Sequence, residues 1–245
     1  MTDFAYIAEN LARVRQKIAA LARATGQPEA TLLVVTKKAT DEQLAALLAL
    51  GVEAIGENYP QAFARRYELL PSLLSGASAS SEVPTLPAMH LIGSLQTNKV
   101  KYVVGRAALI QSVDRLRLAE ELQRQSERQA VITPILLEVN SGAERDKGGV
   151  LPEETEALHA QLSRLSHLRI EGLMTMGPVC RNPEDYRPYF ALTRELFERI
   201  RSRGGFPVPH PILSMGMSGS YEVAIEEGAT LVRVGSEIFR QEPSR

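Results

Sequence analysis

The feature that most constrains the fold is a regular alternation of short apolar stretches with helix-forming stretches along almost the whole chain. Eight of the apolar stretches have the pattern of β-strands, and a helical pattern, or the start of one, follows each of them. The expected strands cover residues 31–36, 52–56, 88–93, 108–113, 132–140, 168–174, 211–215 and 230–234. In a chain of 245 residues this alternation predicts an α/β fold, a single-domain (β/α)8 TIM barrel.

An additional helix is expected before the first strand. Phe4, Ile7, Leu11, Val14 and Ile18 recur at steps of three and four residues and form one apolar face. An open, doubly wound sheet is the alternative architecture. Such sheets usually carry a glycine-rich turn after the first strand, and this sequence has none there.

We expect one domain over residues 1–245, with a single excursion from its surface. Residues 71–87 contain five serines and three prolines and show little periodicity, which predicts a mobile surface loop. Alternation of strands and helices resumes directly after this segment, so it does not mark a domain boundary.

Composition restricts the partners and the compartment. A net charge of −1 argues against a nucleic-acid or anionic-membrane surface. The one cysteine, Cys180, excludes an internal disulfide and fits a reducing cytosol. We find neither a signal-peptide pattern nor an apolar run of about 20 residues, so we expect a cytoplasmic protein without a membrane span.

The first expected strand runs directly into Lys37 and Lys38. A strand that is apolar or Thr at every position is typical of a sheet covered on both faces, where lysine is rare. The strand end is therefore either emerging into solvent, which this stretch alone favours, or presenting a partly desolvated amine that can form a Schiff base with an aldehyde. Strand alternation would turn Lys38 away from the side of Lys37.

Two loops near the C-terminus have the chemistry of an anion site. The seventh expected strand ends in Ser214 and Ser218 with glycines around them, and the eighth ends in Gly235 and Ser236. Hydroxyls, backbone amides and glycines that permit close approach suit a phosphate group. Either loop alone is equally an ordinary turn, but TIM barrels usually hold phosphate after these two strands.

A lysine and a phosphate site at one barrel mouth indicate pyridoxal 5′-phosphate (PLP), which has an aldehyde for the amine and a phosphate for the loops. Arg233 has the same strand parity as Leu231 and would point into the barrel top, toward the ring nitrogen of the cofactor. A salt bridge from Arg233 to Glu57 is an equally open alternative. So is a sugar-phosphate isomerase or lyase barrel that does not use this cofactor.

Six blocks resemble one known family in order and content, and the resemblance extends from the first helix to about Phe239. They are residues 32–37 (LLVVTK), 56–59 (GENY), 90–99 (HLIGSLQTNK), 172–175 (GLMT), 213–218 (LSMGMS) and 232–236 (VRVGS). The chain resembles the pyridoxal phosphate homeostasis protein family, also called YggS-like or PROSC-like. The resemblance implies an alanine-racemase-type barrel, fold type III among PLP proteins, without the second domain of the racemase.

The resemblance also implies a set of cofactor-binding residues and no metal site. The set is Lys37, Asn58, His90, Ser214, Ser218, Arg233, Gly235 and Ser236. Lys37 would carry PLP as an internal aldimine, with Asn58 beside the cofactor and His90 in the same mouth. The serines and Gly235 would hold the phosphate, and Arg233 would face the pyridine nitrogen.

The expected function is storage, buffering or delivery of PLP to PLP-dependent apoenzymes, with little or no catalysis. Arginine stays charged and offers only donors, so a ring nitrogen that faces Arg233 stays unprotonated and stabilises a carbanion weakly. Racemisation also needs a second base, which in the related racemases comes from outside the barrel. With no second domain expected to form a racemase-type dimer, we expect a monomer. The alternative function is a PLP-dependent amino-acid racemase.

Overall fold

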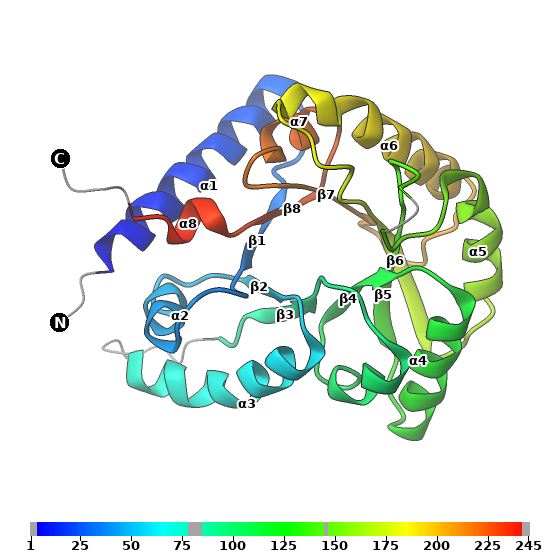
Figure 1. The fold of residues 1–245 in the computed structure, drawn as a ribbon, viewed down its shortest axis with the longest axis horizontal. Coiled ribbons are helices and arrows are strands. Elements are labelled where there is room, and N and C mark those ends of the chain that lie inside the picture. The colour runs from blue at the N-terminus through cyan, green and yellow to red at the C-terminus, as the bar shows by residue number, and fades with distance from the viewer. Residues whose placement is uncertain (1–3, 78–84, 145–146, 242–245) are drawn as a thin grey trace.

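The computed structural model describes residues 4–77, 85–144 and 147–241. In these residues eight parallel strands close into a barrel, each strand pairing with the next and β8 pairing with β1 (Figure 1). The strands are β1 (Thr31–Val35), β2 (Ala54–Glu57), β3 (Ala88–Leu91), β4 (Leu109–Val113), β5 (Thr133–Glu138), β6 (Leu168–Met174), β7 (Ile212–Met217) and β8 (Leu231–Val234). The closed order confirms the (β/α)8 barrel and excludes the open sheet.

Helices surround the barrel (Figure 1). They are α1 (Ala5–Thr25), α2 (Asp41–Leu48), α3 (Pro60–Ala77), α4 (Leu116–Arg128), α5 (Thr155–Leu162), α6 (Arg187–Ser202), α7 (Tyr221–Glu226) and α8 (Ser236–Phe239), with short 3-10 helices η1 (Thr97–Tyr102), η2 (Pro152–Glu154) and η3 (Pro183–Tyr186). The expected N-terminal helix is confirmed as α1, which packs against α7 and α8. No helix within the described residues has the length and apolar character needed to cross a membrane.

Local signals explain several helix starts. The Thr40 hydroxyl accepts from the Gln43 backbone amide at 3.2 Å, and the Gln43 side chain accepts from the Thr40 backbone amide at 2.9 Å, which forms a capping box at the start of α2. Asp114 precedes α4, and its residue type predicts that it caps the helix, but the structure does not bear this out. Arg115 occupies that position without a side-chain cap, and the Asp114 carboxylate instead accepts from the Gly149 amide at 3.4 Å.

The predicted surface loop over residues 71–87 is wrong for its first part, because α3 continues to Ala77. Leu70 and Leu74, one helical turn apart, are both buried in the core. Their burial stabilises the helix here in spite of the serine and proline content of the segment. Pro71 is accommodated on the exposed side of the helix. Residues 78–84 lie outside the described residues.

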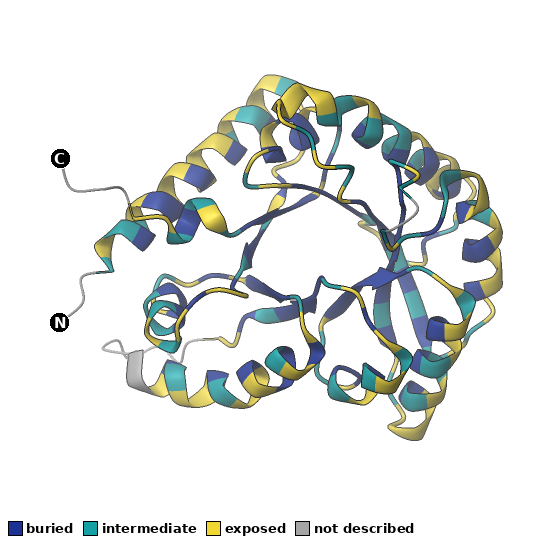
Figure 2. Cartoon of the chain, viewed as in Figure 1, coloured by how far each residue is buried: buried dark blue, intermediate teal, exposed yellow. Residues whose placement is uncertain are grey.

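Apolar side chains fill two distinct spaces. The larger core lies between the strands and the helices, and Figure 2 shows the buried faces of the helices turned toward the barrel. Smaller clusters fill the barrel itself, formed by Leu33, Ala54, Ile92 and Leu231 and by Leu109, Leu136 and Met174. Two residues further along several of these strands, the inward positions are polar: Gln111, Glu138 and Arg233. An apolar floor therefore supports a polar layer beneath the carboxyl ends of the strands.

Gly172 occupies a place in the barrel wall where no side chain fits. The pairing of β5 with β6 shifts by one residue there, and a Cβ atom on Gly172 would lie 1.9 Å from the carbonyl oxygen of Ile212 in β7. We predict that Gly172→Ala lowers the free energy of unfolding by about 3 kcal/mol, because the β6–β7 pair must separate. Denaturant unfolding measures this loss.

Gly26→Ala is the matched control. Gly26 also has a positive φ, +68°, but nothing lies within 4 Å of its added Cβ. The control should therefore lose only about 1 kcal/mol. Equal losses in the two variants would contradict the steric explanation.

Candidate functional site

A cavity of about 650 Å³ lies at the carboxyl ends of the strands. Six of the eight predicted site residues line it: Lys37, Asn58, Ser218, Arg233, Gly235 and Ser236. The other two, His90 and Ser214, are buried in the polar layer and are not among the residues of the described chain that line the cavity. The structure thus brings most of the predicted set together and places two members beneath it.

Lys37 and Lys38 form a turn just beyond β1, and both line the cavity. Because the strand ends at Val35, strand alternation does not extend to this pair, and the prediction that Lys38 is turned away from the side of Lys37 is wrong. Both side chains are exposed, so Lys37 is an accessible amine and not a desolvated one.

Arg233 is buried at the top of the barrel interior, where 3% of the residue is exposed. Its guanidinium donates to the Ser214 hydroxyl at 2.6 Å and to the Thr175 carbonyl at 2.9 Å. Burial lowers the pKa of Arg233 to about 10, and the charge of Glu138 opposes this shift. The guanidinium is therefore a fixed positive charge at neutral pH.

The alternative partner for Arg233 is excluded, because Glu57 is held elsewhere. Its carboxylate accepts from the Thr36 hydroxyl at 2.6 Å and lies 3.3 Å from Nε of Arg66. Burial raises the pKa of Glu57, and the hydrogen bond from Thr36 and the charges of Arg66 and Lys37 oppose the rise. Glu57 and Arg66 therefore form their own buried pair outside the Arg233 network.

A chain of hydrogen bonds leads from Arg233 across the barrel interior. The Ser214 hydroxyl donates to Oε1 of Gln111 at 2.8 Å, and the Gln111 amide lies 2.9 Å from Nδ1 of His90. Since an amide nitrogen can only donate, Nδ1 of His90 is the acceptor and the ring proton is assigned to Nε2. Burial lowers the pKa of His90 to about 4, so the ring is neutral at neutral pH. Ser214 and His90 are thus linked to the cavity through Arg233.

Glu138, at the end of β5, is a cavity residue that was not predicted. It is 7% exposed, and burial raises its pKa to about 7, reinforced by the charge of Asp114 and opposed by that of Arg233. Gly148 fits beside both carboxylates, since its added Cβ would lie 3.4 Å from Asp114 Oδ2 and 3.9 Å from Glu138 Oε2. The sequence could have indicated this position, because alternate residues of a strand face the same side. Glu138 lies two residues beyond Leu136, whose side chain points into the barrel.

The two predicted phosphate loops meet at one wall of the cavity. The Ser218 hydroxyl accepts from the Gly235 amide at 3.2 Å and so joins the loop after β7 to the loop after β8. Gly235 packs on the end of β1, where an added Cβ would lie 2.8 Å from the Val35 carbonyl oxygen. Because Gly235 has no side chain, its backbone packs closely against the end of β1 and still reaches the cavity surface, next to Ser236.

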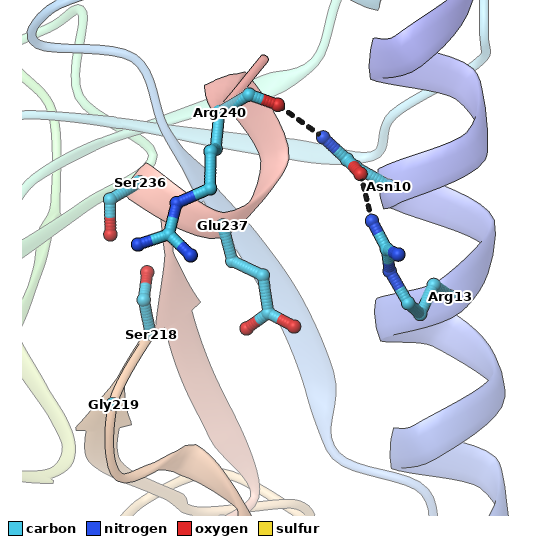
Figure 3. A pocket seen from close by; sticks show the side chains of 7 residues that line it. All are labelled: Asn10, Arg13, Ser218, Gly219, Ser236, Glu237 and Arg240. Carbon is cyan, nitrogen blue, oxygen red and sulfur yellow. Dashed lines mark hydrogen bonds between the residues drawn. The ribbon is translucent and has the colours of Figure 1, made fainter. Parts of the chain in front are cut away.

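The outer side of these loops borders a second cavity of about 430 Å³ (Figure 3). Its lining residues are Asn10, Arg13, Ser218, Gly219, Ser236, Glu237 and Arg240. Ser218, Gly219, Ser236 and Arg240 line both cavities and form the wall between them. Within the described residues, no group of three or more His, Cys, Asp or Glu side chains could hold a metal ion.

Comparison with known proteins places the chain in a family. The profile of the alanine racemase N-terminal domain matches residues 10–243. A pyridoxal phosphate homeostasis protein of Aquifex aeolicus (strain VF5) is 40% identical over 233 residues, which are 94% of this chain and 96% of that relative. The chain belongs to the pyridoxal phosphate homeostasis protein family. The predicted family resemblance is confirmed.

Solved structures extend the likeness of this homeostasis-family chain over its whole length. A protein from Bifidobacterium adolescentis is 32% identical, with a TM-score of 0.86 and 98% of each chain covered. PipY of Synechococcus elongatus PCC7942, solved with PLP bound, is 28% identical, with a TM-score of 0.79, and covers 96% of this chain and 100% of its own. The closed barrel described above is therefore the fold of these relatives.

The raised pKa of Glu138 predicts a specific dependence of stability on pH. A carboxyl whose pKa rises from 4.5 to about 7 on folding stabilises the fold fully below pH 4.5, and this contribution is lost as pH rises through about 7. Glu138→Gln should therefore exceed the wild type in free energy of unfolding at pH 8 by roughly 1–3 kcal/mol, the upper figure being the whole shift. The difference should fade toward pH 4.5.

Denaturant unfolding at the two pH values measures this effect. Glu153→Gln, at an exposed position, is the matched control and should change little at either pH. A Glu138→Gln variant that is less stable than the wild type at pH 8 would contradict the prediction.

Proposed function

We propose that this protein binds pyridoxal 5′-phosphate in the cavity at the strand ends, holds it covalently through Lys37 and serves PLP homeostasis by buffering or delivering it. The observation that carries the proposal is the grouping of Lys37, Arg233 and the Ser218–Gly235–Ser236 wall in one cavity. Support comes from the relatives, which are named pyridoxal phosphate homeostasis proteins, and from PipY, whose structure contains PLP.

The donor set of the cavity fits the cofactor group by group. PLP supplies an aldehyde, whose condensation with the Lys37 amine forms a C=N bond and releases one water. Ser218 and Ser236 offer hydroxyls for the phosphate oxygens, and Gly235, whose amide donates to Ser218, has no side chain to block their approach. In this arrangement Asn58 lines the side of the cofactor, and Ser214 and His90 position Arg233.

The position of Arg233 favours binding of the cofactor without catalysis. Two of its N–H groups are already committed to Ser214 and Thr175, which fixes the plane of the guanidinium. A pyridine nitrogen that meets this cation receives a hydrogen bond at most and gains no proton, so the ring withdraws electrons weakly. This charge arrangement favours a carrier over the racemase alternative.

The amine assignment is tested by the two neighbouring lysines. Lys37→Ala should lose the near-visible absorption band that PLP produces on the protein, because the amine assigned to the imine is removed. Lys38→Ala, which alters the same cavity, should retain it. After borohydride reduction, peptide mass spectrometry should place the modification on Lys37, and modification of Lys38 in the wild type would refute the assignment.

The carrier proposal predicts very slow turnover. Loaded wild-type protein, incubated with several L-amino acids, should racemise or transaminate them far below ordinary enzyme rates of about 1–10³ per second. Chiral chromatography of the products measures this rate. Turnover within that range for any of them would establish the racemase-type alternative.

We further propose that the carrier works in the cytoplasm as a monomer and that PLP-dependent apoenzymes are its recipients. The only cysteine, Cys180, is free, which suits a reducing compartment. The molar mass from analytical ultracentrifugation tests the monomeric state. Activation of an apoenzyme by loaded protein, compared with an equal amount of free PLP, tests delivery.

A further inference from the structure

The wall proposed to hold the phosphate lacks a charge of its own. A phosphate monoester carries about −1.5 to −2 at neutral pH, whereas Ser218, Gly235 and Ser236 are all neutral. Charge-assisted hydrogen bonds to phosphate are roughly twice as strong as neutral ones. A cation that reaches this wall would therefore add much to the affinity for a phosphorylated ligand.

Arg240 is placed to supply that cation. It follows α8, which begins directly after β8 and packs against α1, and its side chain lines both cavities together with Ser218 and Ser236. Figure 3 shows its guanidinium beside the two serines, with their hydroxyls pointing toward it. Across the described residues, no hydrogen bond or ion pair holds this guanidinium. Its donors are available to a ligand.

The main chain at Arg240 is fixed even though its side chain is exposed. Nδ2 of Asn10 in α1 donates to the Ile238 carbonyl at 3.0 Å and to the Arg240 carbonyl at 2.9 Å. Asn10 is 4% exposed, and its side-chain oxygen accepts from Arg13 (Figure 3). This contact, which we call the Asn10 clasp, lowers the cost of directing the Arg240 side chain to the wall.

We propose that Arg240 binds the phosphate of the cofactor as its counter-cation and that Asn10 positions it through the clasp. The inference rests on the proposed function and adds to it a residue from the last turn of the chain. The forked guanidinium matches phosphate oxygens in pairs, which a lysine ammonium does not. Lys38 is the rival cation, since it lines the same cavity from the β1 side.

The experiment compares PLP with pyridoxal, which has the same ring and aldehyde and no phosphate. Dissociation constants for both are measured by the absorption band, at one ionic strength, for wild type, Arg240→Gln, Arg240→Lys and Lys38→Gln. Arg240→Gln should weaken PLP binding about 10- to 100-fold and change pyridoxal binding less than about twofold. Arg240→Lys should fall between wild type and Arg240→Gln for PLP.

Asn10→Ala tests the Asn10 clasp by the ratio of the dissociation constants for PLP and pyridoxal. Thermal unfolding of the variant is measured as well. As a positioning residue, Asn10 should affect PLP more than pyridoxal, whereas a purely structural role would change both equally. The inference is overturned if Arg240→Gln weakens the binding of PLP and of pyridoxal equally, or of neither. It is also overturned if Lys38→Gln is the only variant that weakens PLP binding more than pyridoxal binding. If wild-type protein forms no band with either ligand, the proposed function fails, and this inference fails with it.

Discussion

The site is organised around a positive charge buried inside the barrel. Removing a guanidinium from water is costly, and Arg233 is tolerated because the Ser214 hydroxyl and the Thr175 carbonyl accept its hydrogen bonds. The polar layer above the apolar floor follows from this requirement. Gln111 accepts from the Ser214 hydroxyl and donates to His90, so each of these three residues has a hydrogen-bond partner.

The cavity consequently has a rigid base and an adaptable rim. The base is Arg233 with its buried partners, whereas the cations of the rim, Lys37, Lys38 and Arg240, are exposed and long. In the proposed role, the fixed base would set where a ring lies, and the exposed amines would let a covalent bond form and break without disturbing the fold. Such a division supports the proposed carrier role, in which the ligand is released again.

Much of this arrangement could be read from the sequence, because the period of two along strands is a strong signal. It identified the eight strands and directed Arg233 inward. Depth along the barrel axis is not encoded in that period, so His90 and Ser214 were expected at the mouth although they lie below it. Lys38 was misplaced because β1 ends at Val35, and alternation has no meaning in the turn that follows. Arg240 gave no signal, since the four residues of α8 are too few for a helical pattern.

The direction of the hydrogen bonds behind Arg233 has a consequence for proton movement. Each donor in the series points away from the arginine, from guanidinium to hydroxyl, from hydroxyl to amide oxygen, and from amide nitrogen to imidazole. A relay toward the cavity would need the Gln111 nitrogen to accept a proton, and an amide nitrogen has no lone pair free to do so. The hydrogen-bonded series behind Arg233 therefore does not pass protons toward the cavity.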